Sequence, residues 1–186
     1  HFTAPEFVRA IEEVVSLRAF MPPNAPTIAE NEARALFAMG QAAFFMSGTW
    51  NIETIKALNA NIVFDFVAAP PVRPGAATWM STFADGNYAV NAHSKNRDAA
   101  LRFVRYLASK EYGQQFSDQL RQMSAVPGVF PSDPVLAQIS RASQQQGTPF
   151  IMLVGFRYQD PNGSVMLRDG LQRLMQGQGT ALALAN

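Results

Sequence analysis

Apolar residues recur at helical spacing in several segments, and most of these segments begin with a capping signal. The tetrapeptide TAPE at residues 3–6 has the form of a capping box and precedes an apolar stripe that predicts a helix over residues 4–20. TIAE at residues 27–30 repeats the signal before a helix that Gly40 should end in a left-handed conformation. The same criteria predict further helices over residues 51–58, 97–108, 110–120, 132–145 and 164–175, with a last one capped by Thr180.

Three short apolar runs have the length and the alternation of strands. They are AAFFMS at residues 42–47, IVFDFVA at residues 62–68 and NYAVNA at residues 87–92. Prolines at positions 70, 71 and 74 make the segment after the second run a loop. The first 80 residues or so are thus predicted to run helix, helix, strand, helix, strand.

Two of the predicted helices carry apolar stripes that need a partner surface. The stripe of the first consists of Ala100, Phe103, Val104 and Leu107, and that of the second consists of Tyr112, Phe116 and Leu120. If that surface is lacking, we expect self-association.

Composition excludes several classes of protein. The chain has 186 residues, of which 48% are hydrophobic and 16% charged, as in ordinary globular proteins. Its 15 basic and 14 acidic residues leave no footprint for nucleic acid. There is no cysteine, and the longest apolar runs are far shorter than the roughly 20 residues of a membrane span. The sequence begins without methionine and ends inside a predicted helix, so we expect a processed product or a fragment.

Two segments carry a family resemblance. FAMGQAAFFMSGTW at residues 37–50 joins a helix end, a strand and a Gly-x-Trp turn, and VNAHSKNRDAALRFVRYLASKEYGQQF at residues 90–116 joins a strand, a Ser-Lys-Asn turn and two helices. The closing helix with Gly177 and Thr180 adds a third piece. In this order they resemble the carboxy-terminal part of family 1 extracellular solute-binding proteins of ABC importers, the maltose-binding-protein-like group.

The resemblance implies an α/β fold of the type II periplasmic-binding-protein kind, with two lobes joined by a hinge. Residues 1–82 would begin the second lobe, including the proline-rich loop and the hinge. Residues 83–130 would form a crossover strand and helix pair of the first lobe, and residues 131–186 would return to the second. The chain would then hold the second lobe and an incomplete part of the first, with self-association through the exposed first-lobe remnant.

The best candidate for a ligand contact is Trp50, just after Gly48. It follows a predicted strand and precedes a predicted helix, which is where open α/β sheets bind ligands. By the resemblance, the tryptophan of this turn stacks on the ligand, for which a flat aromatic face is suited. The alternative is a core tryptophan that covers the end of the sheet.

A second group of candidates lies at the presumed hinge, in ATWMSTFADGNY at residues 77–88. Trp79 and Phe83 offer aromatic faces, and Asp85 can accept hydrogen bonds from two hydroxyl groups. Gly86 would permit a close backbone approach or unusual torsions. The alternative is a solvated turn, since Asp-Gly is a common turn dipeptide.

A third group is Arg157 with Tyr158, in the loop before the helix at residue 164. The forked donors of Arg157 suit an acidic or heavily hydroxylated ligand, although a structural salt bridge would use them equally well.

Catalytic, metal and cofactor motifs are lacking. The chain has two histidines, and it contains no phosphate loop, dinucleotide fingerprint or His-Glu-x-x-His helix. We therefore expect a binder that is not an enzyme and needs neither metal nor cofactor. By the resemblance, it captures a small molecule, a sugar or related polyol, between two lobes and delivers it to ABC permease subunits in the membrane, in the periplasm or outside the cell. The alternatives are an extracellular sensing module of a signalling system and a carbohydrate-active enzyme.

Overall fold

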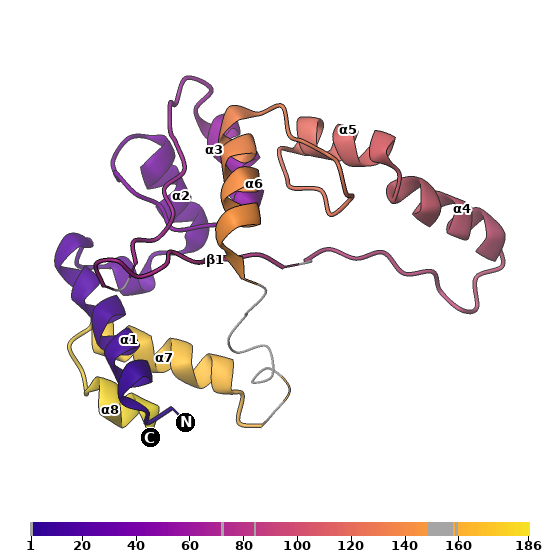
Figure 1. Ribbon diagram of the computed structural model, residues 1–186. Helices are drawn as coiled ribbons and strands as arrows, with labels where there is room; N and C mark the ends of the chain where they lie inside the picture. The colour runs from indigo at the N-terminus through magenta and orange to yellow at the C-terminus, as the bar shows by residue number, and fades with distance from the viewer. Residues whose placement is uncertain (1, 72, 84, 149–157, 159) are drawn as a thin grey trace. The chain divides into compact units, whose positions relative to one another are not determined.

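The computed structural model describes residues 2–71, 73–83, 85–148, 158 and 160–186. The chain divides into two compact units, His1–Glu32 with Ile151–Asn186 and Ala33–Phe150. Each unit has a hydrophobic cluster of its own. Figure 1 shows that helices make up most of the regular structure in both. Among the described residues, no helix is both long and apolar enough to cross a membrane. The assignment of segments to two lobes stays a prediction.

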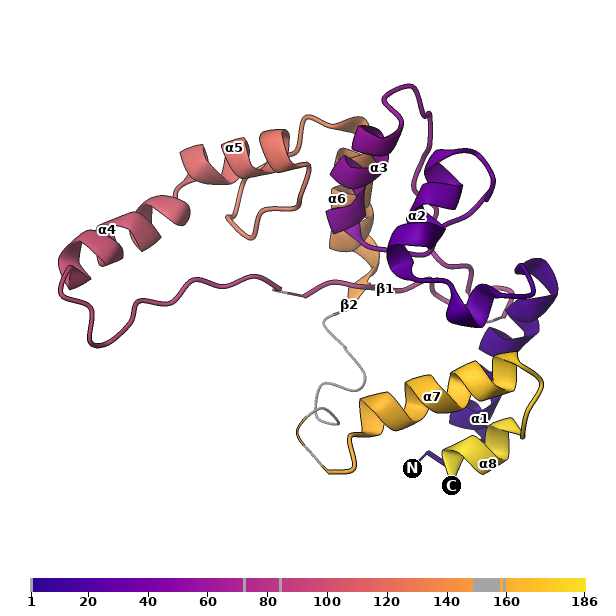
Figure 2. The same ribbon diagram turned by 180° about the vertical axis from the view of Figure 1, so that it is seen from behind.

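The first unit is built from α1 (Pro5–Ser16), α7 (Gly163–Met175) and α8 (Ala181–Ala185), with short 3₁₀ helices η1 (Leu17–Phe20) and η2 (Ala25–Thr27). Ile11, Leu174 and Ala181 form its buried core. Gly170 allows α8 to lie against α7, because a Cβ at this position would collide with the side chain of Leu184. In both Figure 1 and Figure 2, α1 lies beside α8.

Both predicted capping boxes are wrong, although both helices form. Residue Ala4 is the N-cap of α1 and makes no side-chain cap bond, since Pro5 sets the first helical position one residue later than Thr3 requires. Thr27 belongs to η2, where its hydroxyl donates to the Asn24 carbonyl at 2.9 Å. The local signals located the helices but misplaced their first residues.

The caps near the carboxyl end agree better with the sequence. The side chain of Asn162 accepts from two backbone N–H groups at the start of α7, and that of Thr180 accepts from Ala183 at the start of α8. Gly177, after α7, has φ +83°, the left-handed torsion for which glycine is suited.

The second unit packs helices around a core of Ile52, Leu136 and Ile139. Its helices are α2 (Glu30–Ala38, whose first three residues belong to the first unit), η3 (Thr49–Asn51), α3 (Ile52–Leu58), α4 (Arg97–Leu107), α5 (Lys110–Leu120) and α6 (Pro134–Gln146). Both ribbon views show α6 beside α3 (Figures 1 and 2), which is the contact that the buried cluster makes. Gly40 ends α2 with φ +72°, as predicted.

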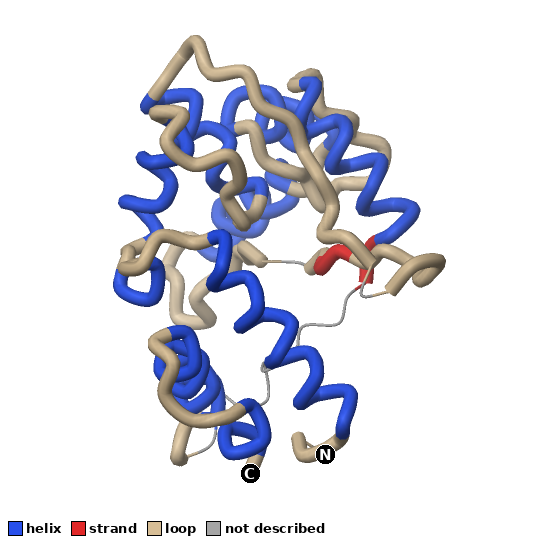
Figure 3. The backbone as a smooth tube through the Cα atoms, turned by 90° about the vertical axis from the view of Figure 1, so that its left-hand side faces the viewer, coloured by secondary structure: helices blue, strands red, loops and turns tan. Residues whose placement is uncertain are grey.

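The three predicted strands are wrong. Among the described residues, the sheet consists of β1 (Met80–Ser81) and β2 (Gly147–Thr148), a parallel pair with Met80 opposite Gly147 (red in Figure 3). Residues 42–47, 62–68 and 87–92 are not strands. Apolar alternation indicates which face a segment would bury, but a strand also needs a neighbour to supply ladder hydrogen bonds.

Some aromatic residues of α4 and α5, including two of the predicted stripe, pack against one another. The ring of Tyr112 lies 5.6 Å from that of Tyr106 and 6.1 Å from that of Phe116. A hydrogen bond with Tyr88 and, to a lesser extent, burial raise the pKa of Tyr112. The side chain of Tyr88 therefore lies within reach of Tyr112 on α5, whereas the sequence predicted that this segment pairs in a ladder.

The rest of those stripes stays on the surface. Leu107 is buried, whereas Phe103 and Leu120 are exposed. Self-association through this surface stays a prediction.

Candidate functional site

Trp50 lies in η3, the single 3₁₀ turn that leads directly into α3. Its side chain is 49% exposed, and its indole ring lies across Gly48, where a Cβ would collide with three indole carbons. The backbone of Gly48 is extended (φ −116°, ψ 177°), so the space that the ring occupies selects glycine, and the torsions do not. The half-exposed indole of Trp50 thus packs on the backbone of Gly48, the residue that begins the turn.

Asn51 anchors this turn from within the unit. It is 1% exposed, its Oδ1 accepts a hydrogen bond from Arg34 of α2, and its Nδ2 donates to Ser47 Oγ. A buried amide with partners on both sides fixes the residues around it. Sequence reasoning missed this role, for which the signal was a polar residue between Trp50 and the apolar start of α3.

Trp79 and Phe83 flank β1 and are both exposed, whereas Met80 between them packs against the core cluster. The ladder with β2 and a further bond from Thr82 N–H to the Thr148 carbonyl (3.0 Å) hold this segment in place. The two aromatic side chains are therefore carried by a fixed piece of backbone and point away from the core.

Asp85 and Gly86 lie in an exposed stretch after β1. A Cβ at Gly86 would meet nothing within 4 Å, and Gly86 is not among the glycines with positive φ. Gly86 therefore does not have the left-handed torsion that glycine favours, and a close backbone approach to a ligand at this residue stays a prediction. Asp85 keeps its place as a candidate acceptor.

The third candidate group belongs to the first unit. Tyr158 is 82% exposed, and Arg157 lies outside the described residues. The other six candidates all belong to the second unit, on two segments that flank one core: Trp50 comes two residues before the buried Ile52, and Trp79 precedes Met80. The structure thus brings two of the three groups to the same hydrophobic cluster.

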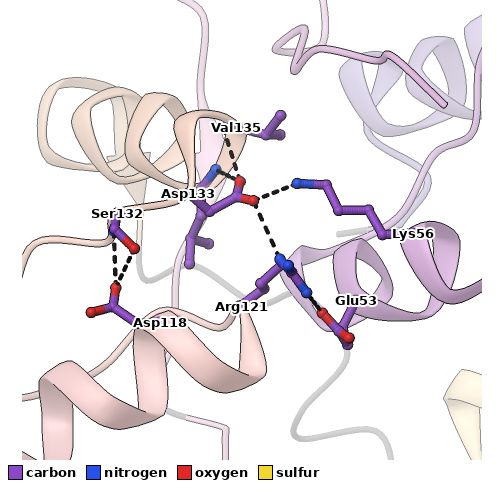
Figure 4. A network of polar contacts seen from close by, with 8 residues as sticks. Glu53, Lys56, Asp118, Arg121, Ser132, Asp133 and Val135 are labelled. Atoms are coloured by element: carbon purple, nitrogen blue, oxygen red, sulfur yellow. Dashed lines mark hydrogen bonds and ion pairs between the residues drawn. The ribbon is translucent and has the colours of Figure 1, made fainter. Parts of the chain in front are cut away.

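Beside this core lies a charged network that the sequence did not reveal (Figure 4). Asp133, the N-cap of α6, accepts hydrogen bonds from Val135 and Leu136 N–H at 3.0 and 3.1 Å and forms an ion pair with Lys56 of α3. Arg121 Nε lies 3.5 Å from the same carboxylate, while its Nη1 pairs with Glu53. The network joins α3, the end of α5 and α6.

Two opposing effects act on the carboxyl group of Asp133. Burial raises its pKa, but the hydrogen bond from Lys56, the backbone donors and the Lys56 charge together lower it further, so the net pKa is lowered. Asp133 is therefore ionised near neutral pH and is unsuited to act as a general acid. Its role is to hold helices together.

Asp118 of α5 adds a second link to α6. Its Oδ1 accepts from the backbone N–H and the hydroxyl of Ser132 at 3.0 and 2.7 Å, and its Oδ2 accepts from Gln114 at 2.9 Å. The bond from Gln114, followed by those from Ser132, lowers the pKa of Asp118. Ser132 was predicted to start α6. It lies one residue before the N-cap Asp133, and its hydrogen bonds to Asp118 connect α5 to the start of α6.

Each unit has one surface recess worth noting. A recess of about 220 Å³ in the first unit is lined by Arg18, Met21, Pro22, Pro23, Ala25, Pro26 and Met175. An open groove of about 640 Å³ in the second unit is lined by Val63, Phe64, Asp65, Pro134, Val135, Gln138 and Arg141. Neither contains a predicted ligand residue. Within the described part of the chain, no group of three His, Asp or Glu side chains could hold a metal ion.

The chain belongs to the family of bacterial extracellular solute-binding proteins, whose sequence profile matches residues 1–114. It is similar to the galactooligosaccharide-binding protein of Bacillus subtilis, with 28% identity over 128 residues, 65% of this chain and 30% of that protein. It is likewise similar to the mannitol-binding protein of Pseudomonas aeruginosa, with 28% identity over 168 residues, 87% of this chain and 36% of that protein. Iron uptake protein A2 of Synechocystis is 36% identical over 80 residues, 43% of this chain and 22% of that protein.

The resemblance found in the sequence is thus confirmed at the level of the family. The chain spans about a third of the length of the first two relatives. Membership implies an α/β binding-protein fold. The described residues of this chain form mainly helices, together with one two-stranded parallel sheet.

Proposed function

We propose that this chain is part of the substrate-binding component of an ABC importer, which captures a sugar or related polyol between two lobes and delivers it to a membrane permease. Two of the relatives are named for a galactooligosaccharide and for mannitol, and the family is extracellular. We accordingly place the protein in the periplasm or outside the cell, as a binder and not an enzyme.

The observation that carries this proposal is the half-exposed indole of Trp50, held on the backbone of Gly48. An aromatic face binds the C–H side of a sugar ring, and a rigid support lowers the entropy that binding costs. The buried Asn51 supports the turn through its hydrogen bonds with Arg34 and Ser47.

The remaining candidates have secondary roles in this proposal. Trp79 and Phe83 add apolar surface near β1, and Asp85 accepts hydrogen bonds from sugar hydroxyls. Arg157 would offer forked donors to the ligand, and Tyr158 a further aromatic ring. A ligand that touches both lobes favours the closed state, and a permease can recognise that state.

Isothermal titration calorimetry with galactose oligosaccharides, mannitol, a dicarboxylic acid and a peptide tests the substrate class. It should be run on the chain and on any longer polypeptide that its gene encodes. We expect saturable heat with a sugar or polyol. Binding of the peptide alone would contradict the proposal.

Tryptophan fluorescence tests the site itself, because the chain has two tryptophans. In Trp79→Phe, the emission reports on Trp50 alone, and a bound sugar should change it. Trp50→Ala should weaken binding by about tenfold or more, as loss of an aromatic anchor does. Sugar binding that Trp50→Ala leaves unchanged would retain the substrate class and reject the site.

A further inference from the structure

Hydrogen bonds connect α2 to both ends of α3. At the start of α3, Arg34 Nη1 donates to Asn51 Oδ1 at 2.5 Å, one residue after Trp50. After its end, Asn59 Nδ2 donates to the Ala38 carbonyl at 2.9 Å. Asn51 and Ala38 are both buried, and all of these residues belong to the second unit. The two links are thus internal and do not depend on what covers the surface of that unit.

The link at the start of α3 also closes the turn that carries Trp50. Asn51 Nδ2 donates to Ser47 Oγ, and the Asn51 backbone N–H donates to the Gly48 carbonyl at 3.1 Å, so both bonds bridge the ends of this short turn. The side-chain bond requires the amide nitrogen of Asn51 to point toward Ser47. Arg34 favours that orientation, because a guanidinium can donate to the amide oxygen but cannot accept from the amide nitrogen.

A link that only joined two helices would not need an arginine. Within the described residues, the Nε of Arg34 is buried and makes no hydrogen bond. A buried donor without an acceptor costs free energy, so this side chain brings a penalty together with its bond to Asn51. At the other end of α3, the neutral amide of Asn59 makes an equivalent link. What Arg34 adds is a group that can only donate and therefore sets the direction of the Asn51 amide.

We propose that Arg34 is a positioning residue for sugar binding, which holds the turn that presents the Trp50 indole by orienting the Asn51 amide. This inference rests on the proposed function, in which Trp50 stacks on a sugar or polyol. Arg34 acts without touching the ligand. Its bond to Asn51 keeps the indole in one place before the ligand arrives, which lowers the entropy that binding costs.

Tryptophan emission tests the positioning without any ligand, in a Trp79→Phe background where it reports on Trp50 alone. Arg34→Met keeps an apolar stem but removes the donor. We expect the anisotropy of Trp50 to fall and its emission to shift toward the red. Arg34→Lys, which again can only donate, should restore much of both signals. Anisotropy and emission that Arg34→Met leaves unchanged would overturn the proposal.

Asn59→Ala is the matched control, because it removes the other link between α2 and α3. If Arg34 only joined the two helices, both variants would lower the free energy of unfolding and would disturb Trp50 alike. We expect both to destabilise the chain in urea, but only Arg34→Met to change the signals of Trp50. An equal change in Asn59→Ala would contradict the proposal.

Ser47→Ala provides the same test if Arg34→Met does not fold. Ser47 is exposed, so its replacement should cost little stability. The variant leaves the bond from Arg34 in place and removes the bond from Asn51 Nδ2 across the turn. We expect the anisotropy of Trp50 to fall. A signal equal to that of the parent would show that the Asn51 amide does not hold the turn, and Arg34 could then not act through it.

Calorimetric titration with mannitol and with a galactose oligosaccharide separates a failure of this inference from a failure of the proposed function. The dissociation constant should be about three- to tenfold larger for Arg34→Met, because binding must then order one more side chain. Arg34→Lys should lie near the parent, and Asn59→Ala within about twofold of it.

Equal dissociation constants in the parent and Arg34→Met would reject the role of Arg34 and retain the substrate class. A parent that binds neither compound, nor any other sugar or polyol, would reject the proposed function, and with it a role of Arg34 in sugar binding. The emission of Trp50 would still decide whether Arg34 holds the turn.

Discussion

At the scale of single residues, Gly48 and Trp50 share one small space. Gly48→Ala should displace the indole, because a Cβ would collide with three ring carbons. Since the ring is already half-exposed, its displacement uncovers little further apolar surface, and the free energy of unfolding should fall by no more than about 1 kcal/mol. In a Trp79→Phe background, the emission of Trp50 should shift toward the red.

Gly86→Ala is the matched control for this prediction. A Cβ at Gly86 meets nothing, so both emission and stability should stay unchanged. Emission from Gly48→Ala that equals that of the parent would show that the indole does not rest on Gly48.

The carboxylate of Asp133, at the start of α6, contacts Lys56 of α3 and Arg121 at the end of α5. Asp133→Asn keeps one acceptor for the backbone donors of α6 but leaves Lys56 and Arg121 without their carboxylate. Removing one member of a buried pair costs about 3–5 kcal/mol, and we expect about 1–2 kcal/mol here because Lys56 and Arg121 are partly exposed. Urea unfolding at pH 7 measures this difference.

The same variant predicts a pH dependence. Because the pKa of Asp133 is lowered in the folded state, its stabilising charge is fully present above the ordinary value of about 3.9 and is lost as the pH falls through the lowered value. The difference between the parent and Asp133→Asn should be constant from pH 7 to about pH 5 and should vanish in more acidic solution. Asp169→Asn, which removes an exposed pair with Arg168, should show almost no difference at any pH.

At the scale of elements, α5 depends on its cap. The Ser109 hydroxyl accepts from the Tyr112 N–H at 3.2 Å, whereas Asn96, at the equivalent position of α4, makes no side-chain cap bond. Ser109→Ala should therefore lower the free energy of unfolding by about 0.5–2 kcal/mol, and Asn96→Ala should cost clearly less. Equal losses in urea unfolding would show that the Ser109 cap contributes nothing of its own.

Helices were predictable because the signals that start and end them lie within a few residues of one another. Ser109 before α5, Gly40 after α2 and Thr180 before α8 all act where the sequence placed them. The predicted strands at 42–47, 62–68 and 87–92 are wrong because pairing depends on another segment, and apolar alternation does not say which segment that is.

In the candidate site, too, features set by neighbouring residues could be predicted, whereas contacts between distant residues could not. The turn at Gly48 and the exposed position of Trp50 follow from neighbouring residues and could be predicted. The link from Asp133 to Lys56 spans 77 positions, and that from Arg121 to Glu53 spans 68, so no local pattern indicates either contact. Asn51 was missed for the same reason, since its partner Arg34 lies on another helix.

At the scale of the whole molecule, the two hydrophobic clusters should respond separately to mutation. Leu174 and the residues packed around it belong to the first unit, and Leu136 with its neighbours belongs to the second. Leu174→Ala and Leu136→Ala should each cost about 2–5 kcal/mol, with amide exchange accelerated in the mutated unit first. Uniform acceleration by either variant, in hydrogen exchange read by mass spectrometry, would show that the chain unfolds as one unit.

The ladder between β1 and β2 also bears on how this chain tolerates change. Residues 82–146 leave the ladder and return to it, and they come back through α6, which supplies Leu136 and Ile139 to the core. The entropy of closing such a loop grows slowly, by about 0.6 kcal/mol for each doubling of its length. The outer part of the excursion, with α4, can thus be lengthened, shortened or exchanged at little entropic cost, provided that α5 keeps its ion pairs and α6 still returns to the same two residues.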